Sequence, residues 1–282
     1  GGAIGDGLFF FCSGFTSFLG RTDNFPNWYK RRINRIYPTI IMWALLSSLF
    51  FDWNWYVEEL IIPPRYWFVP CIMVYYVIFY IIRTFFMNHL KWVFTIFFVV
   101  IALSSIWLLD YTKSVMYADV SFMRVYYFLF MLLGAMTAIS KRKERTPLRA
   151  GVYTIISVGL YYVCMGSYKL DSTLCRFQLI SLMPLLSTIY WLFVFCDAAK
   201  VARIFDKSWM GRPVYFISTL TLEVYMVQYA LFTDRFNDIF PWNILLTYIV
   251  IFLIAYFLKC SSNLFSLLFK EDRITWEKVC QV

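Results

Sequence analysis

The sequence predicts an all-α fold, a polytopic bundle of about nine helices that span a lipid bilayer. Three observations lead to this prediction: a strongly apolar composition, apolar runs of membrane-spanning length, and no period-two alternation within those runs. Hydrophobic residues make up 61% of the 282 residues and charged residues only 15%. Soluble domains are typically about 45–50% apolar and about 25% charged. The chain therefore has too few polar side chains to cover the surface of a soluble protein.

The apolar runs define the predicted helices. A helix needs about 20 mainly apolar residues to cross the hydrocarbon core. The runs are too long for the strands of a membrane barrel, so we expect helices. We also expect residues 1–282 to form a single integral membrane domain. The predicted spans lie at approximately 3–20, 36–53, 66–87, 91–109, 122–140, 150–166, 175–196, 214–233 and 241–259.

The basic residues predict the orientation of these spans. Most of the 26 lysines and arginines fall at alternate ends of the predicted helices. The basic side of a membrane protein faces the cytoplasm, which places the C-terminus inside and Gly1 outside. A translocated N-terminus normally follows a signal or an earlier helix, so we expect one helix to precede Gly1. The formal charge of +9 thus fits membrane orientation and requires no nucleic acid. The basic clusters are 21–35, 83–91, 141–149, 200–212 and 259–278.

Small residues mark one face of the first predicted helix. Gly7 and Gly14 are seven residues apart, and small residues let a second helix approach closely. Helix packing is the simpler interpretation, with Asp6 as an alternative functional carboxylate near the outer end. Arg124 and Arg176, at outer helix ends, are interpreted as interface anchors, although an anionic acceptor is another possible partner.

Three arginines in the first basic cluster are candidates for phosphate binding. Arg32 and Arg35 are three residues apart, so on a helix both guanidinium groups project to one side. Arg31 is adjacent to them. The planar guanidinium group of arginine can donate two parallel hydrogen bonds, which suits phosphate groups. The alternative is an orienting anchor that contacts anionic lipid, and charge alone favours this alternative.

A carboxylate within an apolar run is the second candidate site. Glu223 lies inside the predicted span 214–233, and a carboxylate at membrane depth is costly enough to suggest a function. A structural network that satisfies the carboxylate is an equally good interpretation. Side chains within one or two turns offer hydrogen bonds to it: Ser218, Thr221, Tyr225 and Gln228.

No metal site is predicted. The single histidine, His89, cannot form a ligand cluster, and the seven cysteines are scattered without CxxC spacing.

Four stretches of the sequence resemble motifs of the acyltransferase 3 family, in the family's order. Gly5–Phe15 resembles the family's glycine-containing helix, and Arg32–Pro38 resembles its R-x-x-R-I-x-P loop. Tyr66–Val69 resembles its W-F-L helix start, and Ser218–Gln228 resembles its late S-x-x-T-x-x-I-Y-L-x-H helix. Gln228 stands where many members have histidine. A looser fifth match joins Arg124 with residues 132–134.

The resemblance implies a membrane O-acyltransferase that transfers groups other than aminoacyl groups. Members of the family have ten spans and move an acyl group, often acetyl, from cytoplasmic acyl-CoA to a carbohydrate hydroxyl of a cell-surface glycan. The implied location is the bacterial cytoplasmic membrane. The family's catalytic histidine lies in the first span, so the expected histidine is absent from this chain, which begins where the second helix begins.

The resemblance also assigns roles to residues of this chain. Arg31, Arg32 and Arg35 would bind the CoA phosphates, and Glu223, Tyr225 and Ser218 would support the catalytic centre. Two other functions stay open: a transporter or flippase of a lipid-linked or small acidic substrate, and a catalytically incomplete membrane scaffold.

Overall fold

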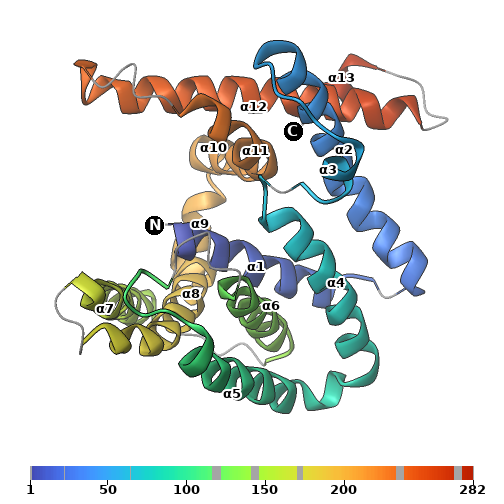
Figure 1. Ribbon diagram of the computed structural model, residues 1–282. Helices are drawn as coiled ribbons and strands as arrows, with labels where there is room; N and C mark the ends of the chain where they lie inside the picture. Colours follow the sequence, from blue (N-terminus) through green and yellow to red (C-terminus); the bar gives the residue numbers. More distant parts are fainter. Residues whose placement is uncertain are drawn as a thin grey trace. The chain divides into compact units, whose positions relative to one another are not determined.

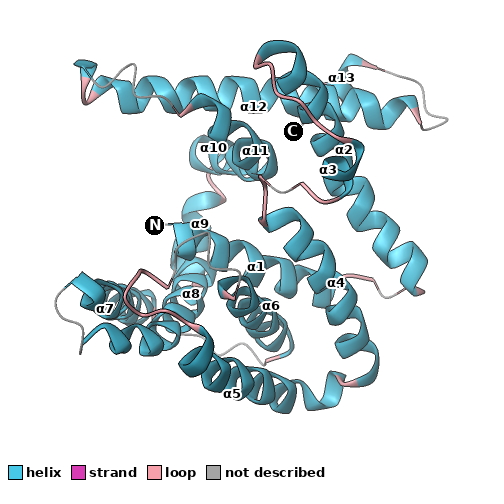
Figure 2. Cartoon of the chain, in the orientation of Figure 1, coloured by secondary structure: helices cyan, strands magenta, loops and turns pink. Residues whose placement is uncertain are grey.

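The computed structural model describes residues 2–21, 23–63, 65–115, 122–140, 146–169, 174–232, 238–269 and 275–281, and within these ranges it is helical without strands (Figure 2). The α-helices are α1 (Gly2–Leu19), α2 (Phe25–Phe50), α3 (Val57–Ile61), α4 (Phe68–Phe85), α5 (Leu90–Leu108), α6 (Met123–Ile139), α7 (Pro147–Gly166), α8 (Leu182–Asp197), α9 (Ala199–Phe205), α10 (Ser208–Thr219), α11 (Thr221–Leu231), α12 (Trp242–Leu268) and α13 (Trp276–Val279). Short 3₁₀ helices are η1 (Met87–His89), η2 (Ser167–Lys169) and η3 (Leu174–Ser181). Residues 141–145 of the predicted basic cluster 141–149 lie outside the described residues.

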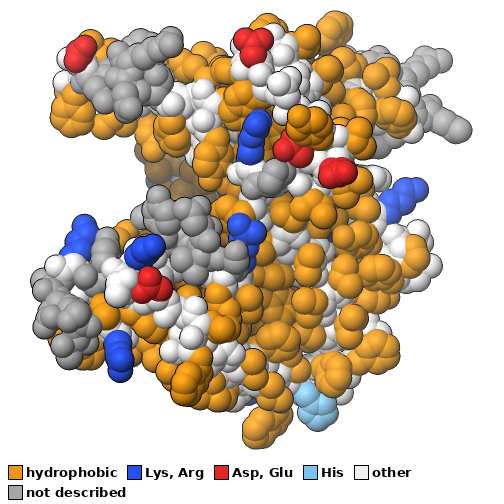
Figure 3. Space-filling model, viewed as in Figure 1, with side chains coloured by type: hydrophobic (Ala, Val, Ile, Leu, Met, Phe, Trp, Pro, Cys, Tyr) orange, Lys and Arg blue, Asp and Glu red, His pale blue; other side chains and the backbone are white. Residues whose placement is uncertain are grey.

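The helices confirm the all-α prediction. Among the described residues, seven helical segments are long and apolar enough to cross a membrane, or eight if the bent pair α10 and α11 counts as one span. The apolar helix α6 has 17 residues and is shorter than these. Apolar side chains cover much of the visible surface (Figure 3), and α5 exposes Leu103 and Trp107. Such surfaces suit lipid rather than water.

The structure differs from the predicted spans at three places, and each difference concerns the candidate site. Helix α2 begins at Phe25 rather than near 36, because Pro26 is tolerated in a first turn, so the three arginines are helical. The predicted run 214–233 is two helices that meet at 66°. Helix α12 continues past the predicted end to Leu268, which places Lys259 inside a helix rather than in a tail.

The chain divides into two compact units, and each is described by itself. The first unit comprises Gly1–Thr22 and Val74–Ile204, and the second comprises Asp23–Met73 and Phe205–Val282. In the first unit α1 packs on α6, and α7 packs on α8 (Figure 1). Phe10 and Phe11 of α1 are fully buried there.

The glycines of α1 and α6 allow the two backbones to touch. A Cβ atom on Gly14 would lie 1.9 Å from the Met131 carbonyl oxygen, and one on Gly134 would lie 2.0 Å from the Phe11 carbonyl oxygen. A Cβ on Gly7 would meet the Ile189 side chain at 3.3 Å. This confirms helix packing as the reason for small residues on α1.

In the second unit, α2, α11 and α12 pack against one another. The C-terminal segment is fixed to α12, because the Asn263 side-chain amide donates to the carbonyl oxygens of Val279 (3.1 Å) and Gln281 (2.9 Å). The three packed helices surround the candidate site.

The glycine contact predicts the effect of one added methyl group. Gly14→Ala should destabilise the fold by about 1–3 kcal/mol, the usual cost of overpacking, because the methyl group meets backbone rather than a movable side chain. Thermal unfolding of the purified protein in detergent measures this change. Gly159→Ala is the matched control, since nothing lies within 4 Å of its added Cβ. Equal stability of the two variants would contradict the described α1–α6 contact.

Candidate functional site

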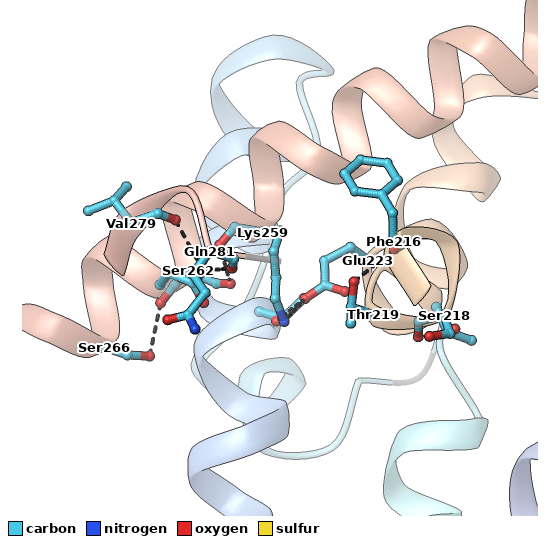
Figure 4. A network of polar contacts seen from close by, with 12 residues as sticks. Phe216, Ser218, Thr219, Glu223, Lys259, Ser262, Ser266, Val279 and Gln281 are labelled. Carbon is cyan, nitrogen blue, oxygen red and sulfur yellow. Dashed lines mark hydrogen bonds and ion pairs between the residues drawn. The ribbon is translucent and has the colours of Figure 1, made fainter. Parts of the chain in front are cut away.

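A buried carboxylate joins three helices of the second unit. Glu223 lies in the first turn of α11, after the break at Leu220, and is 1% exposed. Its Oε1 atom accepts hydrogen bonds from Thr39 Oγ1 of α2 at 3.1 Å and from Lys259 Nζ of α12 at 3.2 Å. Figure 4 shows Lys259 and Glu223 pointing toward one another. The partial positive charge of a helix N-terminus adds to the stabilisation of the carboxylate.

The second carboxylate oxygen is not satisfied. Glu223 Oε2 is buried and has no hydrogen-bond partner among the residues that the structure describes. A buried acceptor left without a donor costs about 1–3 kcal/mol, and more when it is charged. Thr39 and Lys259 therefore hold the carboxylate in place while Oε2 keeps its capacity to accept a hydrogen bond.

Lys259 is one of two residues bound to Glu223 that the sequence analysis missed; the other is Thr39. Lys259 was assigned to a basic tail, because a span that begins near 241 reaches sufficient length at 259. The available signal was the continuation of the helix pattern beyond it, with Leu264 and Leu267 in helical register with Cys260. In the structure the Lys259 side chain is 26% exposed and its ammonium group pairs with Glu223.

A second polar contact joins α2 and α11 one turn further along. Trp43 Nε1 donates to Tyr66 Oη at 2.6 Å, and Tyr66 Oη donates to the Met226 carbonyl oxygen at 2.9 Å. Both aromatic side chains are at most 1% exposed. Burial raises the pKa of Tyr66, which precedes α4, so its hydroxyl stays protonated and able to donate. Trp55, stacked on Tyr66, donates to Ser47 Oγ at 2.8 Å.

These contacts define a line of polar groups on one face of α2, which we call the polar seam. Its members recur at intervals of three or four residues, so they share one helix face. The seam begins at the arginines and continues through the groups that bind Glu223 and Tyr66. The polar seam consists of Arg32, Arg35, Thr39, Trp43 and Ser47.

The three predicted phosphate ligands divide into two groups. The Arg32 guanidinium lies 3.5 Å from the Trp28 ring centroid, and its Nη1 atom donates to the Trp28 carbonyl oxygen at 2.9 Å. Arg35 is exposed one turn further along the seam. Arg31 instead forms an ion pair with Asp23. The structure thus keeps Arg32 and Arg35 on one face, whereas Arg31 is engaged by a neighbouring acid.

Two of the four predicted hydrogen-bond partners of Glu223, Ser218 and Thr221, donate to other acceptors. Ser218 is exposed and donates to the Tyr215 carbonyl oxygen, and Thr221 Oγ1 donates to the Ser218 carbonyl oxygen. The helix break at Leu220 changes the direction of the chain between Ser218 and Glu223, so spacing along one straight helix does not apply.

Tyr225 belongs to an aromatic group rather than to the immediate partners of Glu223. Its ring centroid lies 5.9 Å from that of Tyr66, 5.6 Å from that of Phe68 and 5.8 Å from that of Tyr229. Tyr225 therefore contributes an apolar wall beside the second polar contact.

A surface hollow of about 380 Å³ lies at the junction of α9 and α10. It contains none of the predicted site residues. The added Cβ of a side chain at Gly211 would lie 2.1 Å from the Phe205 carbonyl oxygen, so α10 starts in close contact with the end of α9. Among the described residues, no group of three or more potential ligands is placed to hold a metal ion. The hollow is lined by Phe205, Asp206, Ser208, Gly211, Arg212, Tyr215 and Phe216.

The long apolar helices, with an ionisable cluster between two of them and the shorter helix α11, define an integral membrane protein. The chain belongs to the acyltransferase 3 family, because it matches the family model, described as an acyltransferase domain, over residues 2–260. This match confirms the resemblance seen in the sequence motifs and includes Arg32, Glu223 and Lys259. Neither the curated proteins nor the solved structures contain a match to the chain. Family membership supports acyl transfer in general terms.

The buried pair predicts a difference between single and double substitution. Lys259→Met should destabilise the protein by about 3 kcal/mol, because it leaves a buried carboxylate without its cation. Replacing both partners, as in Glu223→Leu with Lys259→Met, should restore stability to within about 1 kcal/mol of the wild type. Thermal unfolding in detergent measures both values. A double variant as unstable as the single one would show that the two side chains do not interact.

Proposed function

We propose that the protein is a membrane O-acyltransferase that moves an acyl group, acetyl in the simplest case, from acyl-CoA to a hydroxyl of a cell-surface glycan. The hydroxyl oxygen forms an ester bond to the acyl carbon as the carbon–sulfur bond breaks. The hydroxyl proton ends on the released thiol. The observation that carries the proposal is the polar seam in a chain of this family: a pair of arginines followed, on the same face of α2, by Thr39, which binds the buried carboxylate of Glu223.

The arginines supply the donor's phosphate site in this proposal. Arg32 and Arg35 present guanidinium groups on one face, and such groups bind phosphate oxygens with paired hydrogen bonds. The stacking of Arg32 on Trp28 restricts the side chain and so lowers the entropy lost on binding. Arg31, already paired with Asp23, has a weaker role than the sequence suggested.

The rest of the donor follows the seam toward Glu223. A helix rises 1.5 Å per residue, so Thr39 lies about 6 Å along α2 from Arg35 and about 10 Å from Arg32. Glu223 orients the bound substrate, and Tyr225 lines the path with its aromatic ring. Ser218, exposed on α10, takes no part. The basic start of α2 then faces the cytoplasm of a bacterial inner membrane, with the C-terminus on the same side.

Transport is the second candidate function, because a buried acid–base pair between helices also suits the movement of an acidic substrate. Reconstituted vesicles separate the two. With isotope-labelled acyl-CoA outside and a polysaccharide acceptor inside or outside, an acyltransferase produces labelled ester on the polysaccharide. Movement of label into the vesicle without ester formation would reject the proposal and favour a transporter.

The phosphate site predicts a specific loss of donor affinity. Arg35→Ala should weaken acyl-CoA binding about tenfold, the worth of one charge-assisted hydrogen bond. Arg32→Lys should also weaken binding, because lysine keeps the charge but cannot donate two parallel hydrogen bonds or stack on Trp28 as a guanidinium group does. Isothermal titration in detergent measures the dissociation constants. Arg176→Ala is the control for lost surface charge, because Arg176 is exposed and lies outside the seam. Unchanged affinity in both seam variants would remove the phosphate role.

A further inference from the structure

Glu223 Oε2, which lies beside the polar seam, is not explained by the phosphate site. It is a buried acceptor whose partner oxygen, Oε1, is already held by Thr39 and Lys259. A buried acceptor of this kind favours a ligand that brings an N–H or O–H group. The ligand in the proposed function carries such groups: the pantetheine arm of acyl-CoA has two amide N–H groups between its phosphate and its thioester.

We infer that Glu223 Oε2 accepts a hydrogen bond from an amide N–H of the donor's pantetheine arm. The inference rests on the proposed function and makes it more specific. The site then recognises a phosphorylated arm that contains amides, rather than the nucleotide alone. Glu223 and Lys259 form an arm-binding subsite, distinct from the arginines that bind phosphate.

The order of groups along the seam matches the order of groups along the arm. Phosphate binds at Arg32 and Arg35, and Thr39, which marks the position of Glu223, lies about 6–10 Å further along the helix. The amides lie in the middle of the arm, and the thioester lies at its end. The thioester therefore extends beyond Glu223, toward Trp43 and the Tyr66 hydroxyl.

The neighbours of Glu223 suit a carboxylate that accepts a hydrogen bond from an amide N–H group. Lys259 pairs with the carboxylate through Oε1 at 3.2 Å, which leaves Oε2 as the acceptor for the ligand. Thr39 fixes Oε1, so the direction of Oε2 is set before the ligand arrives. An ordered acceptor loses little entropy on binding.

Regular helix is interrupted at two places beside the Glu223 contact. Pro38, directly before Thr39, has no N–H, so α2 lacks one main-chain hydrogen bond there. The α10–α11 break, with its 66° bend, lies three residues before Glu223. Both interruptions of regular helix adjoin the Glu223 contact.

The test compares acyl-CoA with two analogues, each of which replaces one pantetheine amide N–H with an ester oxygen. Phosphates, length and thioester are unchanged. For the wild type, one of the two analogues should bind about ten- to a hundredfold more weakly than acyl-CoA. In Glu223→Leu with Lys259→Met, all three ligands should bind equally. Arg35→Ala is the matched control: it should weaken all three by a common factor and preserve the discrimination.

A second variant covers the case in which the double substitution fails to fold. Glu223→Gln retains an acceptor oxygen but no charge, so the discrimination should fall to a few-fold rather than vanish. Discrimination unchanged in either variant, or none in the wild type, would overturn the assignment of Glu223. Labelled ester formation by the same wild-type sample would then leave the acyltransferase proposal intact. Failure of the wild type to bind acyl-CoA and to form ester would reject the proposed function itself.

Discussion

The arrangement of the second unit depends on one constraint, the burial of a carboxylate in an apolar environment. A charge at this depth is tolerated only with a cation and hydrogen-bond donors beside it. Glu223 meets this requirement with groups from two other helices, Lys259 of α12 and Thr39 of α2. The registers of α2, α11 and α12 are therefore coupled, because a shift of any one of them by a residue would separate the charge from its partners.

The same constraint connects the carboxylate to the rest of α2. Thr39 is followed one turn later by Trp43, which reaches the Met226 carbonyl through Tyr66. Met226 lies one turn beyond Glu223 on α11. Two successive turns of α2 are thus joined to two successive turns of α11 by hydrogen bonds. The arginines that begin the seam stand on the same rigid face, which fixes their position relative to Glu223.

The sequence predicted parts of this site whose physical signal is local. A carboxylate within an apolar run indicated Glu223, and a spacing of seven indicated the contact at Gly14. Thr39 gave no signal, because a lone threonine in an apolar helix satisfies its own hydroxyl through the backbone in most cases. Lys259 was missed for a related reason: a lysine near the end of a sufficient apolar run is usually an interface anchor. The break at Leu220 was also missed, since neither glycine nor proline marks it.

An ion pair buried between three helices carries a large free-energy cost of desolvation. Apolar side chains of similar volume commonly give equal or greater stability than a buried ion pair. Among the described residues, Glu223 Oε2 also has no hydrogen-bond partner. Packing alone therefore does not account for the ion pair. Three features lie along the α2–α11 contact: the paired arginines of α2, the Glu223 carboxylate held by Thr39 and Lys259, and the buried acceptor Oε2. The chain belongs to an acyltransferase family over residues 2–260, and the donor that we propose has anionic and hydrogen-bond-donating groups in the order that these three features require.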